Sequence, residues 1–311
     1  MSSSGYESWF ISARDPVSDR ALWIRHTRHR PRPGPESAAL WCTVVDRDLG
    51  TPSLLVKEVF ADFPAGTGAG PGRFRGQASM DGQSARWDLV ITGDQAPLRP
   101  LRPAALYRAP LPRTKLEAVV PDGRFDGTLE IGGREVAVSG WRGTAGHNWG
   151  SEHADSWVWL HAADFGTAAG PGHAPEAWLE LVLARIKVGP ARSPWTAMGA
   201  LGLDGERIVL GGLGRRPLVD AGPGRLAASI GSPGARLLLS VTTEDADAVA
   251  VTYADPQGGN RTVRHAALAA VTLTLRRPGR PDVTLSSRHG AYEYGSAQPM
   301  PGIVPRALPA G

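Results

Sequence analysis

Cysteine is nearly absent from the sequence, with Cys42 the single example among 311 residues. One thiol cannot form a disulfide within the chain, and a cysteine-based zinc site needs more than one. Long apolar runs are also missing, since no stretch approaches the roughly 18 residues of a membrane-spanning helix. The first ten residues lack the basic and apolar regions of a signal peptide. We therefore expect a cytoplasmic protein with no stable membrane insertion and at most peripheral membrane contact.

The excess of positive over negative charge is also small. The 34 basic and 30 acidic side chains leave a net charge of +4. The densest basic stretch, residues 25–32, has no interleaved aromatic residues. Both observations argue against a nucleic-acid-binding protein.

Signals for a bound metal or cofactor are weak. The glycine-rich residues 66–70 are followed by proline and glycine instead of a helix, which argues against a phosphate-binding loop. His147, His153 and His161 do not have the spacing of a standard zinc motif. The sequence therefore predicts neither a metal nor a cofactor.

Helical periodicity is almost absent. Instead, short runs of β-branched and aromatic residues are separated by Gly, Pro and Asp. The pairs Gly132-Gly133 and Asp204-Gly205 are typical of two-residue hairpins, whose type I′ turns require positive φ at both positions. Many short strands at this spacing favour an all-β fold of antiparallel sandwiches or barrels.

The length of the chain is about twice that of a typical domain. A division near residues 145–155 gives two halves, 1–150 and 151–311. Each half is long enough for an antiparallel barrel of about eight strands. We therefore predict two consecutive antiparallel β-barrel domains.

Tryptophan is unusually frequent in the sequence. There are ten, against six Phe and five Tyr, and all lie between positions 9 and 195. In the expected strand that begins at Trp157, strand parity places Trp157, Trp159 and His161 on one face, about 7 Å apart in succession. Such a face could bury a large apolar ligand or stabilise a carbocation through the indole rings. Alternatively, these side chains could simply fill a core.

Two further groups of polar residues are candidates for a site. His147 and Asn148 could present a proton donor and an amide to a ligand, or could tie the two halves together through backbone hydrogen bonds. Glu58 and Glu180 each lie in phase with apolar neighbours on an expected strand. A carboxyl group on an apolar face has a raised pKa and can act as a general acid. If the parity is shifted by a bulge, both would instead face water.

Three segments of the chain resemble, in the same order, the AttH-like and carotenoid 1,2-hydratase proteins, which are related to tocopherol cyclases and lipocalin-like Diels–Alderases. The central segment is His-Asn-Trp-Gly at residues 147–150, followed by Trp157 and Trp159. The other segments are residues 7–10 with 21–25, and residues 178–188 leading to 194–195. The resemblance covers most of residues 1–200.

This resemblance implies two consecutive lipocalin-like β-barrel domains with a ligand cavity. It also implies isoprenoid, polyene or polyketide-derived substrates, and reactions that begin with protonation or hold a reactive conformer. Relatives often carry an acidic residue before the motif histidine, where this sequence has Gly146. If that acid donates the proton in a hydratase, this chain needs another donor. Glu152, His153 and His161 are the nearest substitutes.

We therefore expect a cofactor-independent enzyme that cyclises, isomerises or hydrates a hydrophobic, alkene-containing small molecule. His147, Glu152 and His161 are expected to supply or relay a proton. The residues expected to contact the substrate are Asn148, Trp149, Trp157, Trp159, Trp178, Glu58 and Glu180. A pericyclic reaction would need no proton donor, only shape and a hydrogen bond. The alternative is a non-catalytic carrier of lipids or pigments, whereas a filled core would indicate a structural module.

Overall fold

The computed structural model describes residues 4–47, 51–70, 72–167, 176–212 and 214–309. These residues form antiparallel strands joined by loops, with short 3-10 helices at η2 (Ala104–Tyr107) and η3 (Asp245–Asp247). The all-β prediction is therefore confirmed. Among the described residues, no helix has the length and hydropathy needed to cross a membrane.

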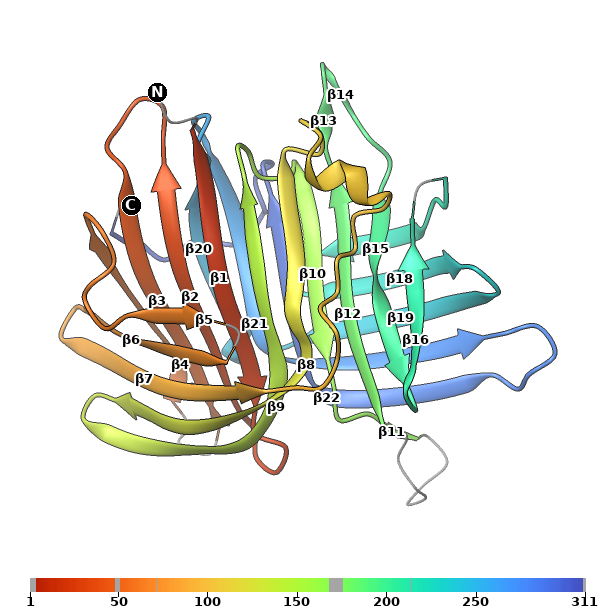
Figure 1. Ribbon diagram of the computed structural model, residues 1–311, viewed down its shortest axis with the longest axis horizontal. Helices are drawn as coiled ribbons and strands as arrows, with labels where there is room; N and C mark the ends of the chain where they lie inside the picture. Colours follow the sequence, from red (N-terminus) through yellow and green to blue (C-terminus); the bar gives the residue numbers. More distant parts are fainter. Residues whose placement is uncertain (1–3, 48–50, 71, 168–175, 213, 310–311) are drawn as a thin grey trace.

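The first large sheet contains nine strands in the order β4-β3-β2-β1-β9-β8-β7-β6-β5, so that its first strand pairs with its last (Figure 1). Among the described residues, β4 and β5 are the ends of this order. The strands are β1 (Gly5–Arg14), β2 (Arg20–Arg30), β3 (Ser37–Asp46), β4 (Thr51–Phe60), β5 (Gly68–Gly70), β6 (Arg73–Met80), β7 (Gln83–Thr92), β8 (Thr114–Ile131) and β9 (Arg134–Gly150).

The second large sheet follows the same plan, because its first strand, β10, also pairs with its last, β22. The main order is β16-β15-β12-β10-β22-β21-β19-β18-β17; β11 pairs with β22, β20 pairs with β21, and β13 and β14 form a separate hairpin. The strands are β10 (Ser156–Ala162), β11 (Gly166–Thr167), β12 (Ala177–Arg185), β13 (Lys187–Val188), β14 (Ala191–Arg192), β15 (Thr196–Leu203), β16 (Glu206–Gly211), β17 (Leu218–Gly222), β18 (Arg225–Ser232), β19 (Ala235–Thr243), β20 (Ala248–Ala254), β21 (Asn260–Arg276) and β22 (Val283–Ser296).

Both hairpin turns that the sequence predicts are present. Gly132 and Gly133 join β8 to β9 with φ values of 55° and 83°. Asp204 and Gly205 join β15 to β16 with φ values of 48° and 80°. Positive φ at both central positions is the geometry of a type I′ turn, whose twist matches that of the flanking strands.

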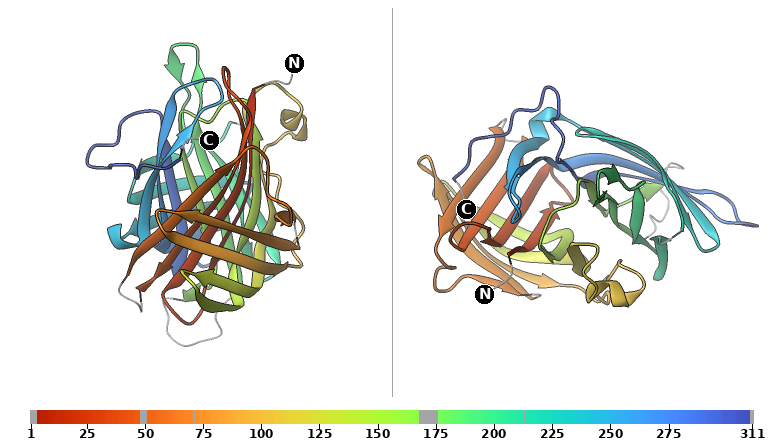
Figure 2. Two further views of the ribbon diagram at one scale, coloured as in Figure 1. Left: turned by 90° about the vertical axis from the view of Figure 1, so that its left-hand side faces the viewer. Right: turned by 90° about the horizontal axis from the view of Figure 1, so that it is seen from above.

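The two sheets lie side by side, and each curves strongly when the molecule is seen from above (Figure 2). The chain passes from the first sheet to the second between Gly150 and Ser156. Whether residues 1–150 and 151–311 fold as separate domains stays a prediction.

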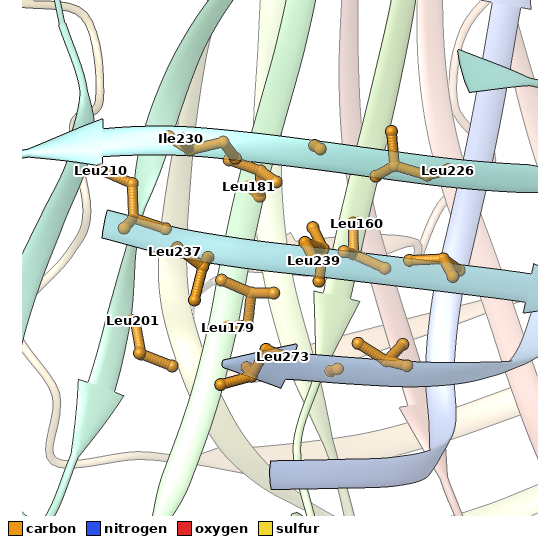
Figure 3. Close-up of a cluster of buried hydrophobic side chains, with 14 of the residues drawn as sticks. Leu160, Leu179, Leu181, Leu201, Leu210, Leu226, Ile230, Leu237, Leu239 and Leu273 are labelled. Atoms are coloured by element: carbon orange, nitrogen blue, oxygen red, sulfur yellow. The ribbon is translucent and has the colours of Figure 1, made fainter. Parts of the chain in front are cut away.

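Each curved sheet encloses an apolar core of its own. In the second sheet, leucines from strands near both ends of the sheet meet those of β10 and β12, as Figure 3 shows for Leu210 and Leu226 beside Leu160 and Leu181. Full burial of each such side chain contributes about 1.5–3 kcal/mol to folding. The core of the first sheet is built in the same way around Trp87 and other buried apolar residues.

Side chains of the two sheets also pack against each other. Phe10 of β1 packs with Trp159 and Val182 of the second sheet. Trp41 of β3 belongs to a buried cluster with Tyr253 of β20. These contacts place Phe10, Trp41, Trp159 and Tyr253 at the interface between the two sheets.

The two faces of β10 differ as strand parity predicts. Val158 and Leu160 point into the leucine-rich core of the second sheet. Trp157 and Trp159 lie on the other face and pack against the interface between the sheets. The aromatic face therefore points toward the neighbouring sheet and not into the interior of its own.

Candidate functional site

A cavity of about 360 Å³ lies at this interface, beside the aromatic face of β10. Both sheets contribute to its wall, with Phe10 and Leu116 from the first and Trp157, Trp159 and Val182 from the second. Its size and apolar lining are typical of a small-molecule site.

The long loop between β7 and β8 also lines the cavity, through Leu101 and Leu106. The Tyr107 hydroxyl fastens this loop to β8, because it donates a hydrogen bond of 2.7 Å to the carbonyl oxygen of Leu116. The cavity is thus bordered by a loop segment in addition to the two sheets.

Two carboxyl groups enter the cavity from the strands on either side of β10. Glu180 lies on β12, opposite His161 in the strand register. Glu293 lies on β22, opposite Trp159. Paired residues point to the same face of an antiparallel sheet, so both glutamates share the aromatic face of β10. Each also accepts a hydrogen bond from one of its tryptophans.

Glu180 accepts one such hydrogen bond. Trp159 Nε1 donates to Glu180 Oε1 at 2.6 Å. Among the described residues, Oε2 has no hydrogen-bond partner; the nearby Thr144 hydroxyl donates instead to the carbonyl oxygen of Val120 at 3.0 Å. Burial dominates, and it raises the pKa of Glu180 to about 8 although the Trp159 bond, the Thr144 hydroxyl and the Arg14 charge all act to lower it.

Glu293 is equally buried but has more partners. Trp157 Nε1 donates to Oε1 at 2.8 Å, and the Tyr253 hydroxyl donates to Oε2 at 3.0 Å. His265 Nδ1 lies 3.6 Å from Oε2. Burial by itself raises the pKa of Glu293, but the His265 ring, the Arg25 charge and the Trp157 bond outweigh it and bring the pKa below its ordinary value.

A stack of nearly parallel rings crosses the interface next to these carboxyl groups. The His265 ring lies between Trp23, at 4.1 Å between ring centroids, and Trp159, at 6.1 Å. Burial lowers the pKa of His265, so the ring is neutral at neutral pH. The stack gives the cavity a rigid π-rich side that could shelter positive charge.

His153, one of the substitutes considered for the missing acid, lines the cavity. Four other residues expected from the sequence also line it: Asn148, Trp157, Trp159 and Glu180. Strand parity places them together, because Trp157 and Trp159 alternate along β10 and Glu180 pairs beside them on β12. Asn148 comes from β9, across the interface.

His161 shares the aromatic face but lies away from the cavity. Its Nδ1 accepts a hydrogen bond of 3.1 Å from Arg14 Nη1, and its Nε2 donates one of 3.2 Å to the Pro121 carbonyl oxygen. Burial and the Arg14 charge hold the pKa of His161 well below its ordinary value. His161 is therefore a neutral link between the two sheets and is not among the residues that line the cavity.

His147 and Trp149 lie on the opposite face of β9 from Asn148. The His147 ring is stacked between Trp9 and Trp149, with centroid distances of 5.0 and 4.6 Å. Its Nε2 lies 3.1 Å from Glu7 Oε1. Neither side chain lines the cavity, because adjacent residues of a strand alternate between faces.

The remaining expected residues also lie outside the cavity wall. Glu152 pairs with Arg113 at 2.5 Å in a polar groove nearby. Trp178 packs on Ala118 and Ala200 at the same interface. Glu58 accepts hydrogen bonds from the backbone N–H and hydroxyl of Ser79 at 2.8 and 2.9 Å. Although its strand parity matches that of core residues, Glu58 lies where an end strand of the sheet approaches β6, and its carboxylate faces this edge.

Several polar residues of the cavity were not expected from the sequence, among them Glu293, Tyr253 and Arg25. Glu293 and Tyr253 come from the last third of the chain, and Arg25 comes from the basic stretch at residues 25–32, for which the sequence predicted no site. The alternation of Tyr292, Glu293 and Tyr294 is a strand signal that could have revealed Glu293. Among the described residues, no cluster of three or more His, Cys, Asp or Glu side chains is arranged to hold a metal ion.

Comparison with solved structures assigns the fold. CghA matches over 94% of this chain and 88% of its own, with a TM-score of 0.61 and 12% identity. A putative AttH from Nitrosomonas europaea matches over 94% of this chain and 92% of its own, with a TM-score of 0.51 and 13% identity. The chain has the AttH-like fold. The resemblance read from the sequence is thereby confirmed at the level of the fold, with two large antiparallel sheets.

Kievitone hydratase from Nectria haematococca has the same fold, with a TM-score of 0.50 and 12% identity over 94% of this chain and 88% of its own. CghA has also been crystallised with the small molecule Sch210972. The AttH-like fold therefore includes a hydratase and a protein that binds a small molecule.

Comparison with curated sequences gives partial matches. The chain is 30% identical over 166 residues to the uncharacterized proteins MT0513 and Rv0493c of Mycobacterium tuberculosis. The match covers 50% of this chain and 48% of each relative, so the chain spans about half the length of the curated relatives it matches. No protein-family model matches the chain.

Proposed function

We propose that this chain is a cofactor-independent enzyme that protonates an alkene-containing hydrophobic small molecule in the cavity between the sheets. Glu180 is the proton donor. The observation that carries the proposal is the buried position of this carboxyl group on the cavity wall, where burial raises its pKa to about 8. At neutral pH the group is protonated, and its Oε2 has no hydrogen-bond partner among the described residues, so the acid proton is available to a ligand.

The proposed step transfers the Glu180 proton to one alkene carbon. The π electron pair forms the new C–H bond, and a carbocation remains on the adjacent carbon. The indole rings of Trp157 and Trp159 shelter that cation by cation–π interaction, worth about 2 kcal/mol where water is excluded. The Glu293 carboxylate adds a fixed negative charge on the same wall.

The fate of the cation decides the product. Loss of a proton to the Glu293 carboxylate gives an isomer. Attack by a second alkene of the same molecule gives a ring and a new cation, which then loses a proton to Glu293. Attack by water gives an oxonium ion, which becomes an alcohol when it loses a proton to Glu293. Glu180 regains its proton from solvent or from Glu293 after the reaction. No redox partner is needed in any of these routes.

The fold supports a reaction of this class without identifying it. Kievitone hydratase shares the fold, and hydration of an alkene begins with the same proton transfer. The apolar wall also suits a carrier of hydrophobic molecules, which would bind the ligand unchanged.

The test uses purified protein in D₂O with a panel of polyenes, isoprenoids and unsaturated polyketide-type compounds, analysed by mass spectrometry. Proton transfer from Glu180 leaves one deuterium on a product carbon. Replacement of Glu180 by Gln preserves the shape of the side chain but removes the acid, and we expect product formation to fall by about 10²–10⁴-fold. Glu58→Gln is the matched control, because Glu58 lies outside the cavity, and it should retain full turnover.

Each other result has a definite meaning. A product without deuterium that forms equally well in the Glu180→Gln variant would indicate a pericyclic reaction and reject proton transfer. Tight binding without product across all the tested classes would identify a carrier.

A further inference from the structure

Arg25 is a buried cation without an anionic partner. Its side chain is 7% exposed and lines the main cavity. Among the described residues, none of its nitrogens forms an ion pair, and Nη1 has no hydrogen-bond partner. Buried guanidinium groups are ordinarily paired, because removing an unpaired charge from water is costly.

The contacts that Arg25 does make hold it in place without neutralising it. Its Nε and Nη2 both donate to Ser8 Oγ, at 3.3 and 3.2 Å. Its Cζ lies 4.1 Å from the Tyr253 ring centroid and 5.2 and 5.3 Å from those of Trp23 and Trp41. The three rings orient the guanidinium, and the donors on Nη1 remain unused.

The surroundings of Arg25 add positive charge. Lys57, also buried, lines an adjoining cavity of about 380 Å³ that Arg25 borders as well. Burial and the Arg25 charge lower the pKa of Lys57 to about 8. Two carboxylates on these walls have hydrogen-bond or ion-pair partners other than Arg25: Glu293 is bound by Trp157 and Tyr253, and Glu7 lies against His147. The Arg25 charge lowers the pKa of Glu293, but no ion pair joins the two side chains.

We infer that the cavity takes ligands that carry a carboxylate-like anionic group at one end, and that Arg25 binds this group. The guanidinium offers two parallel N–H groups, a geometry that matches two carboxylate oxygens. The apolar remainder of the ligand then lies along Trp157 and Trp159.

This inference deepens the proposed function by naming a substrate class, a hydrophobic unsaturated acid. The rings of Trp23, His265 and Trp159 stand in a stack between Arg25 and the Trp159–Glu180 pair. The anionic end and the alkene that receives the proton are therefore at different parts of one molecule. Ligand binding, unlike turnover, tests the anion site by itself.

The experiment is a fluorescence titration with cis-parinarate and with its methyl ester, two polyenes of nearly the same shape that differ in charge. Both are used at neutral pH, below the concentration at which they aggregate. We expect the wild-type protein to bind the acid at least about tenfold more tightly than the ester, the range for a hydrogen bond to a charged group.

Three variants assign that preference to Arg25. In Arg25→Met the ratio of acid to ester affinity should fall to about one, and in Arg25→Lys it should lie between the two values because the charge remains without the paired N–H groups. Arg264→Met is the matched control. Arg264 is another buried arginine, but it pairs with Asp245 away from the cavity, so its loss should leave the ratio unchanged.

Three results would each overturn the inference. The wild type could bind acid and ester equally, it could fail to bind the acid, or the preference for the acid could stay unchanged in both Arg25→Met and Arg25→Lys. These outcomes are separable from the fate of the proposed enzyme. A preference for the acid without any turnover supports the anion site and rejects the proposed enzyme. Turnover of neutral alkenes, with equal affinities for the acid and the ester, supports the enzyme and rejects the anion site.

Discussion

Glu180 and Glu293 occupy almost equivalent places and differ in ionisation. Each lies on a strand that flanks β10, each is buried at the same cavity, and each accepts an indole N–H from β10. Yet the pKa of Glu180 is raised to about 8, and that of Glu293 is lowered. Burial raises the pKa of both. At Glu180 it outweighs the Trp159 bond, Thr144 and the Arg14 charge, whereas at Glu293 the His265 ring, the Arg25 charge and the Trp157 bond outweigh it.

This difference in pKa gives the two glutamates different chemical roles. Two carboxyl groups whose surroundings separate their pKa values form an acid and a base in one site. Glu180 holds a proton at neutral pH, and Glu293 holds a negative charge. The account therefore depends on the contrast between them, and the following variants test that contrast in order of decreasing effect.

The largest effect is expected from Glu180→Gln as the pH changes. Between about pH 4.5 and 8 the unfolded chain ionises Glu180 while the folded chain keeps it protonated, so wild-type stability falls as the pH rises through this window. The variant lacks this penalty. By about pH 9 it should be more stable than the wild type by up to about 4 kcal/mol, with almost no difference near pH 4.5. Urea unfolding across this pH range measures it.

The opposite sign is expected from Glu293→Gln. Because the folded-state pKa of Glu293 is lowered, its contribution to stability is present above its ordinary pKa and is lost as the pH falls through the folded value. Removing this charge near pH 7 should destabilise the protein by about 2–3 kcal/mol, because Trp157 and Tyr253 lose a charged acceptor. The same unfolding series measures it. If Glu180→Gln and Glu293→Gln were both more stable than the wild type at high pH, the two glutamates would not differ in ionisation as proposed.

A smaller effect should separate the two tryptophans. Trp159→Phe removes the indole donor of Glu180, so the pKa of Glu180 should rise further, by about one pH unit. Trp157→Phe leaves Tyr253 bound to Glu293 and should move the pKa of Glu293 by less. Carboxyl titration of each variant by infrared spectroscopy gives the two shifts, and equal shifts would show that donor number does not set the difference.

The smallest effects are expected from two glutamates outside the cavity. Glu58→Gln and Glu152→Gln alter partly exposed groups that are bound to Ser79 and Arg113. Each should change the free energy of unfolding by less than about 1 kcal/mol and leave parinarate affinity unchanged. A marked loss of affinity in either variant would place that carboxylate in the ligand site.

The part of the site that the sequence predicts follows from strand parity. Trp157, Trp159 and Glu180 were expected on apolar faces, and the alternation of a regular strand holds regardless of the surroundings. Parity does not say what a face packs against. Both faces of β10 are apolar, so the sequence could not distinguish the leucine-rich interior from the interface where the cavity lies.

Glu293 was missed for a different reason. A histidine and a glycine at positions 289 and 290 interrupt the run of strand-forming residues in the sequence, whereas β22 continues to Ser296. Pairing with β10 and β21 on either side carries the strand through Gly290. Glu58 shows the converse error, because its parity was that of core residues but its position near the end of the sheet turned the carboxylate to Ser79. Tertiary pairing, which one sequence does not contain, decides both cases.

The most direct test of the account is the protonation state of Glu180 itself. Infrared difference spectra between the wild type and Glu180→Gln isolate its carboxyl stretch, with Glu293→Gln as the comparison. The account predicts a protonated carboxyl band at neutral pH that disappears as the pH rises through about 8, that is absent from Glu180→Gln and that persists in Glu293→Gln. A Glu180 that is fully ionised at neutral pH would contradict it.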